Sequence, residues 1–252
     1  MKDARRKQME ELIARRQTVS MEELCQLFQV CMNTVRADVA HLVRSGAVEK
    51  VYGGVRAAQS AQVPLFSQRM TISSQAKLAI ARRAEELICD GDRIYIDAGT
   101  TTMALLDCLQ SGKHVTVLTR NLHIITRALD RPEVELIVLP GMADRRTHCL
   151  ADAGTLEFLG RYQLDKAFMG VSGISPQGQL NVSSYIEYEL KRQAMARSGH
   201  SYLLADAGKF GQTGLMSYGT LTDLTAVVTD RPDSELAHLC RAQNVPLLVS
   251  EG

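Results

Sequence analysis

The chain has 252 residues, of which 45% are hydrophobic and 23% charged, proportions that describe a globular protein with a sizeable core and exclude an intrinsically disordered chain. Its 29 basic and 28 acidic side chains nearly cancel, which excludes a histone-like polybasic protein. No stretch approaches the roughly 18 apolar residues of a membrane span, and the charged N-terminus is unlike a signal peptide. We therefore expect a cytoplasmic protein with no membrane partner.

The charge is unevenly distributed along the chain. Residues 1–56 carry ten basic and seven acidic side chains, a net charge of +3 that leaves −2 for the remainder. The first apolar pattern, over 5–16, predicts a short amphipathic helix with a basic outer face, followed by a break at 17–19. Ser20 then precedes Glu23 at capping-box spacing, which predicts a second helix with Met21 to Phe28 supplying its buried face.

A third helix is expected after a turn of three residues. Its apolar stripe runs from Val35 to Val43, which leaves the polar side chains of its N-terminal half facing outward, and Gly46 ends it. Two short helices joined by a tight turn have the geometry of a helix-turn-helix, and 47–56 predicts two small strands around Gly53 and Gly54, a β-wing. A purely structural helical packing module with a charged, solvated face is the alternative.

The exposed residue types of this region suit duplex DNA. A guanidinium can bridge guanine O6 and N7, and a carboxamide can bridge adenine N6 and N7, whereas bases outside the third helix would meet phosphates and set the register. The residues expected to contact DNA are Arg5, Arg6, Asn33, Thr34, Arg36, His41, Lys50 and Tyr52.

A linker is expected over 58–74, which is rich in Ala, Gln and Ser and contains Pro64. It separates a winged helix-turn-helix domain over 1–57 from a domain over 75–252. In the second domain apolar strands alternate with helices, which predicts an α/β fold with a mostly parallel sheet. Strands are expected over 94–96, 115–118, 134–139, 167–169, 202–204, 226–228 and 247–249, and helices over 77–88, 103–109, 122–129, 155–159, 186–197 and 234–242.

Ligands of such sheets bind beyond the carboxyl ends of the strands, where helix N-termini point free N–H groups outward. The segment 97–102 (DAGTTT) occupies such a place: Gly99 allows the backbone to approach an anion, the threonine hydroxyls can donate to phosphate, and Asp97 can accept from sugar hydroxyls. A merely capped turn is the alternative. If Arg120, Lys191 or Lys209 joined this segment, the pocket would suit a small phosphorylated polyol.

Catalytic equipment is sparse. No Ser, Cys or His has the partners of a nucleophilic triad at a known spacing, although Asp97 with Glu187 and Glu189 would be carboxylates able to isomerise a sugar phosphate. The six cysteines are scattered without a CxxC pair, so we expect reduced thiols, no metal site and no cofactor; the adjacent His148 and Cys149 are weak evidence for either chemistry.

Taken together, the motifs resemble the DeoR family of bacterial transcriptional regulators. The segments that carry the resemblance, in chain order, are MEELCQLFQVCMNTVRADVAHLVRSGAVEKVYGGV, ICDGDRIYIDAGTTT, VLTRNL, LPG, FMGVSGISPQG and LADAGKFG. The resemblance implies an oligomeric repressor of a carbohydrate operon, a homodimer or homotetramer that binds double-stranded operator DNA with the helix 32–44 in the major groove. It also implies a C-terminal sensor domain similar to sugar-phosphate isomerases, which binds a phosphorylated metabolite without catalysis.

The effector pocket follows from this resemblance together with the strand-end pattern. Its expected residues are Asp97, Gly99, Thr100, Thr101, Arg120, Gly170, Gly173, Glu187, Lys191, Asp206 and Lys209. An active isomerase-like enzyme with an appended DNA-binding domain remains the alternative function.

The chain departs from the family pattern at four positions. Ala37 stands where a second Arg is common, and Cys31 replaces a helix-capping Ser at a cost of roughly 1 kcal/mol. Met142 replaces a second Gly. Arg120 stands where Asn is frequent, so this guanidinium either favours a more anionic ligand or pairs with Asp97.

Overall fold

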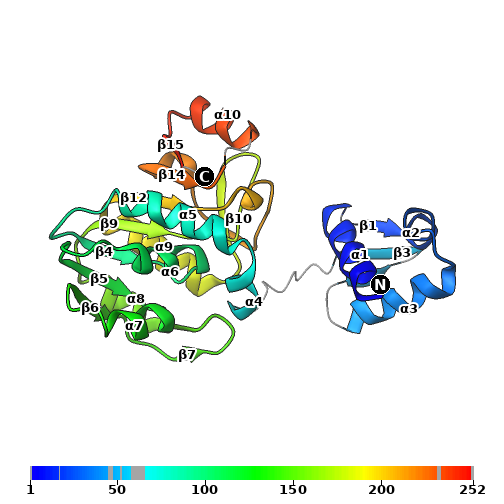
Figure 1. Ribbon diagram of the computed structural model, residues 1–252, viewed down its shortest axis with the longest axis horizontal. Coiled ribbons are helices and arrows are strands. Elements are labelled where there is room, and N and C mark those ends of the chain that lie inside the picture. Colours follow the sequence, from blue (N-terminus) through cyan, green and yellow to red (C-terminus); the bar gives the residue numbers. More distant parts are fainter. Residues whose placement is uncertain are drawn as a thin grey trace. The chain divides into compact units, whose positions relative to one another are not determined.

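The computed structural model describes residues 2–16, 18–44, 48–51, 53–57, 66–231 and 234–250. The chain divides into an N-terminal unit, Met1–Pro64, and a C-terminal unit, Leu65–Gly252, and Figure 1 traces both along the sequence. Within the described residues, no helix is long and apolar enough to cross a membrane.

The N-terminal unit is a winged helix-turn-helix, as predicted. Its elements are α1 (Lys2–Arg16), β1 (Thr18–Ser20), α2 (Met21–Phe28), α3 (Met32–Arg44), β2 (Val48–Val51) and β3 (Gly54–Ala57). The Oγ of Ser20 accepts from the Glu23 amide at 3.1 Å, which confirms the Ser20 half of the capping box predicted for α2. The Glu23 carboxylate instead forms an ion pair with Arg16. Met9, Leu24 and Val39 are fully buried in the core between the three helices and the wing.

One strand of this unit was not predicted. The expected break at 17–19 contains β1, which pairs antiparallel with β3 and completes a sheet of order β1-β3-β2. Three residues are too few to show an alternating pattern in the sequence. The strand is instead defined by its pairing with β3 of the wing, which is distant in the sequence. Gly54 permits it, since a Cβ at that position would lie 2.4 Å from the Val19 carbonyl oxygen.

The C-terminal unit is built on a seven-stranded parallel sheet, which confirms the predicted fold class. The order is β15-β14-β12-β9-β4-β5-β6. The strands are β4 (Arg93–Ile96), β5 (Val115–Thr119), β6 (Val134–Val138), β9 (Leu164–Met169), β12 (Ser198–Leu204), β14 (Ala226–Thr229) and β15 (Leu247–Val249). The 3-residue cores predicted for β9 and β12 extend toward their N-termini, where polar residues continue the parallel pairing.

Helices cover both faces of the sheet (Figure 1). One core contains side chains of α4 (Phe66–Thr71), α5 (Ser74–Glu85), α6 (Thr100–Cys108) and α7 (Leu122–Ala128). The other contains side chains of α8 (Ala153–Leu159), α9 (Tyr185–Ala196) and α10 (Ser234–Ala242). Because helices cover both faces of the sheet, the side chains of its strands are buried on both sides. This explains why the strands are continuous apolar runs in the sequence.

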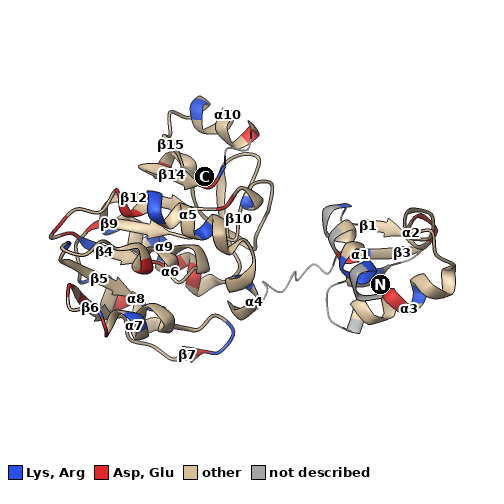
Figure 2. Ribbon diagram, in the orientation of Figure 1, with Lys and Arg blue, Asp and Glu red and all other residues tan. Residues whose placement is uncertain are grey.

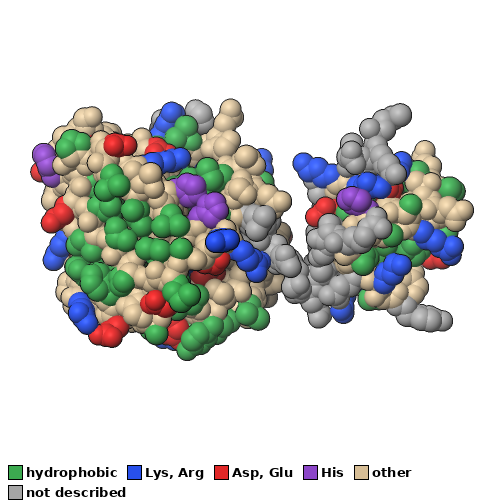
Figure 3. Space-filling view, turned by 90° about the horizontal axis from the view of Figure 1, so that it is seen from below, with side chains coloured by type: hydrophobic (Ala, Val, Ile, Leu, Met, Phe, Trp, Pro, Cys, Tyr) green, Lys and Arg blue, Asp and Glu red, His purple; other side chains and the backbone are tan. Residues whose placement is uncertain are grey.

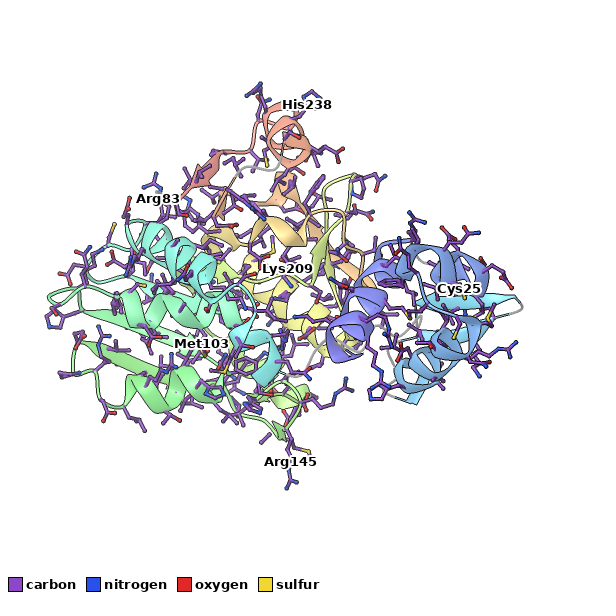
Figure 4. All side chains as sticks on the ribbon, turned by 45° about the vertical axis from the view of Figure 1, so that its right-hand side comes forward. Cys25, Arg83, Met103, Arg145, Lys209 and His238 are labelled. Carbon is purple, nitrogen blue, oxygen red and sulfur yellow. The ribbon has the colours of Figure 1, made fainter. Side chains whose placement is uncertain are left out.

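Several short elements escaped prediction. An antiparallel sheet contains β10 (Gly173–Ile174), β11 (Gln179–Val182) and β13 (Met216–Thr220), and a hairpin joins β7 (Ala143–Asp144) to β8 (Cys149–Leu150). Two single 3-10 turns are η1 (Ala207–Lys209) and η2 (Leu221–Asp223). Arg145, at the tip of the hairpin, points away from the unit (Figure 4).

The segment expected as a linker, 58–74, contains helix α4, and α5 begins at its last residue. Phe66 anchors α4 because its ring is fully buried and stacks on the rings of His123 and His148, with centroids 4.9 Å and 5.1 Å away. A six-residue helix spans less than two turns, too few to show an amphipathic period. Residues 58–65 lie outside the described part of the chain.

Candidate functional site

Helix α3 presents a polar face to solvent. Asn33, Arg36 and His41 are exposed and Thr34 is half-buried, whereas Val35 and Val39 are buried. The spacing of the exposed side chains places them along one side of the helix. On the wing, Lys50 of β2 is also exposed, and Tyr52 lies outside the described residues. On α3, the side chains of Asn33, Thr34, Arg36 and His41 provide the donors and acceptors that base edges require.

Arg5 and Arg6 have a different environment from the one expected of phosphate contacts. Their Nε atoms donate to the two oxygens of Asp38 at 2.8 Å and 2.9 Å, and the Asp38 carboxylate is completely buried. Burial alone would raise the pKa of Asp38, but the hydrogen bonds from Arg5 and Arg6 outweigh it and lower the pKa. The two arginines thus fasten α1 to α3. Figure 2 shows basic segments on α1 and an acidic segment on α3.

Cys31 directly precedes α3, at the position where a capping Ser was expected. Its Sγ lies 3.3 Å from the Oγ1 of Thr34. Hydrogen bonds from the Thr34 hydroxyl and amide lower the pKa of the exposed Cys31 thiol. The sulfur therefore occupies the position of the missing Ser oxygen and is a weaker acceptor there.

In the C-terminal unit, a buried polar network surrounds Asp97 at the end of β4. Asp97 forms an ion pair with Lys191 of α9, and its Oδ2 accepts from the Gly170 amide at 2.9 Å. Lys191 also donates to the Gly170 carbonyl at 2.8 Å, to which the Tyr218 hydroxyl donates at 3.1 Å. Burial would raise the pKa of Asp97, but Lys191 and Arg120 outweigh it and lower the pKa. Asp97 is therefore an ionised acceptor.

The residues at the start of α6 lie beside this network. Gly99 is the N-cap and provides no side-chain cap, so the first N–H groups of the helix lack intrahelical partners. Thr100 and Thr101 are 8% and 6% exposed. Thr102 differs from the expectation that three hydroxyls donate to a ligand, because its Oγ1 donates to the carbonyls of Asp97 and Gly99 at 2.7 Å and 3.0 Å.

Arg120, at the end of β5, is buried next to the same network. Its Nη1 donates to the Leu150 carbonyl at 3.4 Å, whereas its Nε and the hydroxyl of the neighbouring Tyr95 have no hydrogen-bond partner within the described residues. Burial would lower the pKa of Arg120, but Tyr95, Cys149 and Asp97 outweigh it and raise the pKa. Since Asp97 is paired with Lys191, the guanidinium retains a donor with no acceptor.

The remaining predicted residues occupy neighbouring places. Glu187 lies in the first turn of α9 and interacts electrostatically with Arg120. Asp206 caps η1 by accepting from the Gly208 amide at 3.1 Å, and Lys209 is half-buried at the end of η1 (Figure 4). Gly173 begins β10, away from the hydrogen bonds around Asp97.

Two cationic residues near this site were not predicted. Arg69 of α4 interacts electrostatically with Glu187 and Asp97, and Lys77 of α5 is 6% exposed and interacts with Asp206 and Lys209. The position of Lys77 could have been found in the sequence. It lies three residues before Ile80, which places both side chains on the buried face of the helix. Arg69 had no such signal, because no helix was expected there.

Hydrogen bonds and an ion pair join Asp97, Gly170 and Lys191 at the centre of the predicted effector site. The described residues line a cavity of about 360 Å³ beside Leu122, His123 and His148. They also line one of about 480 Å³ beside Arg192 and Tyr218, the tyrosine whose hydroxyl donates to the Gly170 carbonyl. Figure 3 shows apolar side chains gathered on the face of the C-terminal unit formed by α7, β6 and the hairpin.

The geometry offers little for catalysis. Burial raises the pKa of the Cys149 thiol to about 11, so it is protonated at neutral pH. Lys191 holds the Asp97 carboxylate ionised, and an ionised carboxylate cannot act as a general acid. Within the described residues, no group of three or more His, Cys, Asp or Glu could hold a metal ion.

Comparisons with known proteins agree with both units. The family described as "DeoR-like helix-turn-helix domain" matches residues 5–61, and "DeoR C terminal sensor domain" matches residues 72–231. The HTH-type transcriptional regulator IolR of Bacillus subtilis is 37% identical over 97% of this chain and 98% of its own. The glycerol-3-phosphate regulon repressor of Escherichia coli is 29% identical over 88% of each chain.

A solved structure of ribose 5-phosphate isomerase A from Methanocaldococcus jannaschii is similar over 54% of each chain, with 17% identity and a TM-score of 0.41, a likeness too weak to support an argument about function. The two family matches, one to each unit and together spanning most of the sequence, show that the chain belongs to the DeoR family of transcriptional regulators.

Proposed function

We propose that the chain is a cytoplasmic repressor that binds double-stranded operator DNA through α3 and the wing and responds to a small phosphorylated, sugar-related metabolite bound near Asp97. The exposed face of α3, which includes Asn33, Arg36 and His41, is the observation that carries the DNA-binding part. Relatives named as repressors, of the glycerol-3-phosphate regulon and GlcR of Bacillus subtilis, support the regulatory part.

On the DNA side, Arg36 is the best candidate for a base contact. It is exposed and projects from the first half of α3, the part of a recognition helix that meets base edges. Lys50 is the candidate phosphate contact on the wing. Arg5 and Arg6 are assigned a secondary role, because Asp38 already binds both guanidinium groups.

On the effector side, the residues around Asp97 suit a polyol that carries a phosphate. Arg120, Lys191 and Lys209 are cationic and Asp97, Glu187 and Asp206 are anionic, so phosphate oxygens and sugar hydroxyls would each find complementary groups. The uncapped N-terminus of α6, with Thr100 and Thr101, adds N–H and hydroxyl donors. The unpartnered Nε of Arg120 is a further donor toward an anionic ligand.

The repressor is proposed to act as a homodimer or homotetramer, since two recognition helices are needed to reach successive half-sites of an operator. Effector and operator would be linked by a coupling free energy of about 1–3 kcal/mol, which changes operator affinity by about 5- to 150-fold.

The test begins with DNA selected from a random pool by the full chain. Fluorescence anisotropy then gives the affinity of the wild type, of Arg36→Ala and of the control Arg82→Ala, an exposed arginine on α5. Loss of one bidentate base contact costs about 1–3 kcal/mol, so specific affinity falls at least fivefold in Arg36→Ala and stays constant in the control. Equal affinities for all three proteins would refute the assignment of α3.

The effector half is tested on the same complex with a panel of sugar phosphates, polyol phosphates and their unphosphorylated counterparts. A change of operator affinity confined to phosphorylated compounds supports the proposal. Turnover of any of these compounds by the purified chain would instead favour an isomerase-like enzyme. No observation in the described residues supports that alternative.

A further inference from the structure

Helix α7 carries apolar side chains on two of its sides. Ile124 and Ala128 are buried in the core against the sheet. Leu122, Ile125 and Leu129, spaced by three and four residues, form a second stripe on another side of the helix, and Leu129 is 75% exposed. A surface helix ordinarily has one apolar stripe, which faces its own core. The outer stripe of α7 therefore has the composition of a contact surface.

The apolar surface continues beyond α7. Val138, at the end of β6, and Met142, just before the hairpin, are 38% and 75% exposed. Within the described residues, β6 is the last strand of the large sheet and pairs with β5 alone. Figure 3 shows the apolar side chains of this side of the unit as one gathered area. We call the surface formed by Leu122, Ile125, Leu129, Val138 and Met142 the α7 face. Exposed apolar areas of this kind mark sites of protein association.

The α7 face has a hollow at one end and a protruding side chain at the other. The hollow is the cavity of about 360 Å³ between the first turns of α7 and the hairpin, where Leu122, Thr126 and Ala143 are among its lining residues. Leu129 lies seven residues after Leu122, which is about 10 Å further along the helix axis. The two features thus stand at opposite ends of the same helix.

The charges at these two ends have opposite signs. Arg145 lines the hollow and is exposed at the tip of the hairpin, next to the exposed Arg146. Asp130, which directly follows Leu129, is also exposed. Neither Arg145 nor Asp130 forms an ion pair with another described residue. The end with the hollow is therefore basic, and the end with the protruding leucine carries an acidic side chain.

A second copy of the chain offers the complement of both ends. A two-fold axis across the middle of the face would set the two α7 helices antiparallel, so that each end meets the opposite end of the other copy. Leu129 would then enter the hollow of the other copy, and Asp130 would meet Arg145 at its rim. Both contacts occur twice, because the same patch of each subunit forms a two-fold interface.

We propose that the α7 face is the two-fold interface between two copies of this chain, with Leu129 seated in the partner's hollow and Asp130 paired with the partner's Arg145. The inference rests on the proposed function and deepens it, because two recognition helices require an interface between copies. An unrelated protein would need a leucine and a carboxylate at the same spacing, whereas a second copy has them by symmetry. An apolar centre with charged residues at its rim is also the usual anatomy of such interfaces.

The proposed interface adjoins the start of the C-terminal unit. His123 and His148 line the hollow, and both rings stack on Phe66 of α4. The Phe66 amide also donates to the carbonyl of Arg146 in the hairpin at 3.1 Å. Phe66 comes directly after residues 58–65, which connect it to the wing in the sequence. Association through the α7 face would therefore hold the attachment points of two DNA-binding units beside one interface.

The experiment exchanges the charges of the proposed pair in the full chain. Asp130→Arg places two Arg–Arg pairs in the interface and Arg145→Asp places two Asp–Asp pairs, whereas a dimer of one variant with the other regains two pairs of opposite charge. Sedimentation equilibrium should show that self-association weakens at least tenfold in each variant. It should recover to within threefold of the wild type in the equimolar mixture.

Arg82→Asp, a charge reversal at an exposed position of α5, is the control and should change self-association less than twofold. If the wild type is a tetramer, the single variants should sediment as dimers. Two single variants that associate as strongly as the wild type would overturn the interface. A mixture that associates no more strongly than the single variants would overturn the pairing of Asp130 with Arg145.

The apolar contact is tested by Leu129→Gln. Because Leu129 is 75% exposed, its replacement leaves the core of the unit intact, and Leu215→Gln, at a position that is 74% exposed just before β13, is the matched control. Self-association should weaken at least tenfold in Leu129→Gln and less than twofold in Leu215→Gln. An equal effect of the two substitutions would contradict the seating of Leu129 in the hollow.

DNA binding separates this proposal from the proposed function. Asp130→Arg should bind a duplex with one half-site as the wild type does, and it should lose the added affinity that the wild type gains from a second half-site. A wild type that is monomeric at every concentration but binds selected DNA would overturn the interface and leave the proposed function standing. A wild type that associates through the α7 face but binds no selected DNA would refute the proposed function instead.

Discussion

The substitution Asp38→Asn removes the charge that holds α1 against α3. Asp38 is completely buried and accepts from Arg5 and Arg6, whose side chains are 25% and 15% exposed. A hydrogen bond to a charged group contributes about 1.5–3 kcal/mol, so two would contribute at most about 6 kcal/mol. Partial solvation of both guanidinium groups reduces this value. We therefore expect the N-terminal unit to lose about 2–3 kcal/mol.

Native-state hydrogen exchange of the α3 amides in the full chain measures this loss. A unit of roughly 60 residues has a stability of about 3–9 kcal/mol, so the expected change is a large fraction of the total. Glu10→Gln, at an exposed position of α1, is the matched control and should change the opening free energy by less than about 0.5 kcal/mol.

The dependence on pH provides an independent check. The pKa of Asp38 is lowered in the folded state, so its stabilising contribution is present above the unfolded-state pKa of about 3.9 and is lost as the pH falls through the folded-state pKa. The stabilities of the wild type and Asp38→Asn should converge over that range. A variant as stable as the wild type at pH 7 would show that Arg5 and Arg6 are not fastened and are available to DNA phosphates.

Two other predictions concern single side chains. Arg5→Ala should leave the salt dependence of operator binding nearly unchanged, because each true phosphate contact adds about 0.9 to the slope of log affinity against log salt; a decrease of that size in a salt titration would contradict the pairing with Asp38. Thr102→Val removes a buried hydroxyl that donates to the carbonyls of Asp97 and Gly99, and urea unfolding should show a loss of about 1–2 kcal/mol; an unchanged midpoint and slope would show that the hydroxyl is dispensable.

Local patterns accounted for most of the fold. The cap of α2 depends on Ser20 and Glu23, three residues apart, and each core strand of the parallel sheet is a short apolar run bounded by polar residues. Both features are readable in a window of a few residues. By contrast, β1 depends on pairing between Val19 and Val55, and α4 depends on the burial of Phe66 among rings that lie far along the chain. Such elements are stabilised by tertiary contacts that no local window contains.

The partners of the charged residues also depend on tertiary contacts that a local pattern does not contain, and these partners decide which function is assigned to each residue. Residue type alone assigned Arg5 and Arg6 to DNA phosphates, yet their acceptor is a carboxylate 33 and 32 positions away. Strand-end reasoning assigned Asp97 and Gly170 to one edge of the sheet, because the carboxyl ends of adjacent parallel strands meet there, and in the structure the Gly170 amide donates to Asp97. It could not find Arg69, since that residue belongs to α4, a helix that the sequence did not predict.

Arg120 illustrates how one contact decides between two readings of a sequence. The sequence allowed it either to pair with Asp97 or to favour a more anionic ligand. The Asp97 carboxylate is instead paired with Lys191, and the Arg120 guanidinium keeps an unpartnered Nε in a buried position. A buried cationic donor is costly without an acceptor, so the second reading is the one that this arrangement supports.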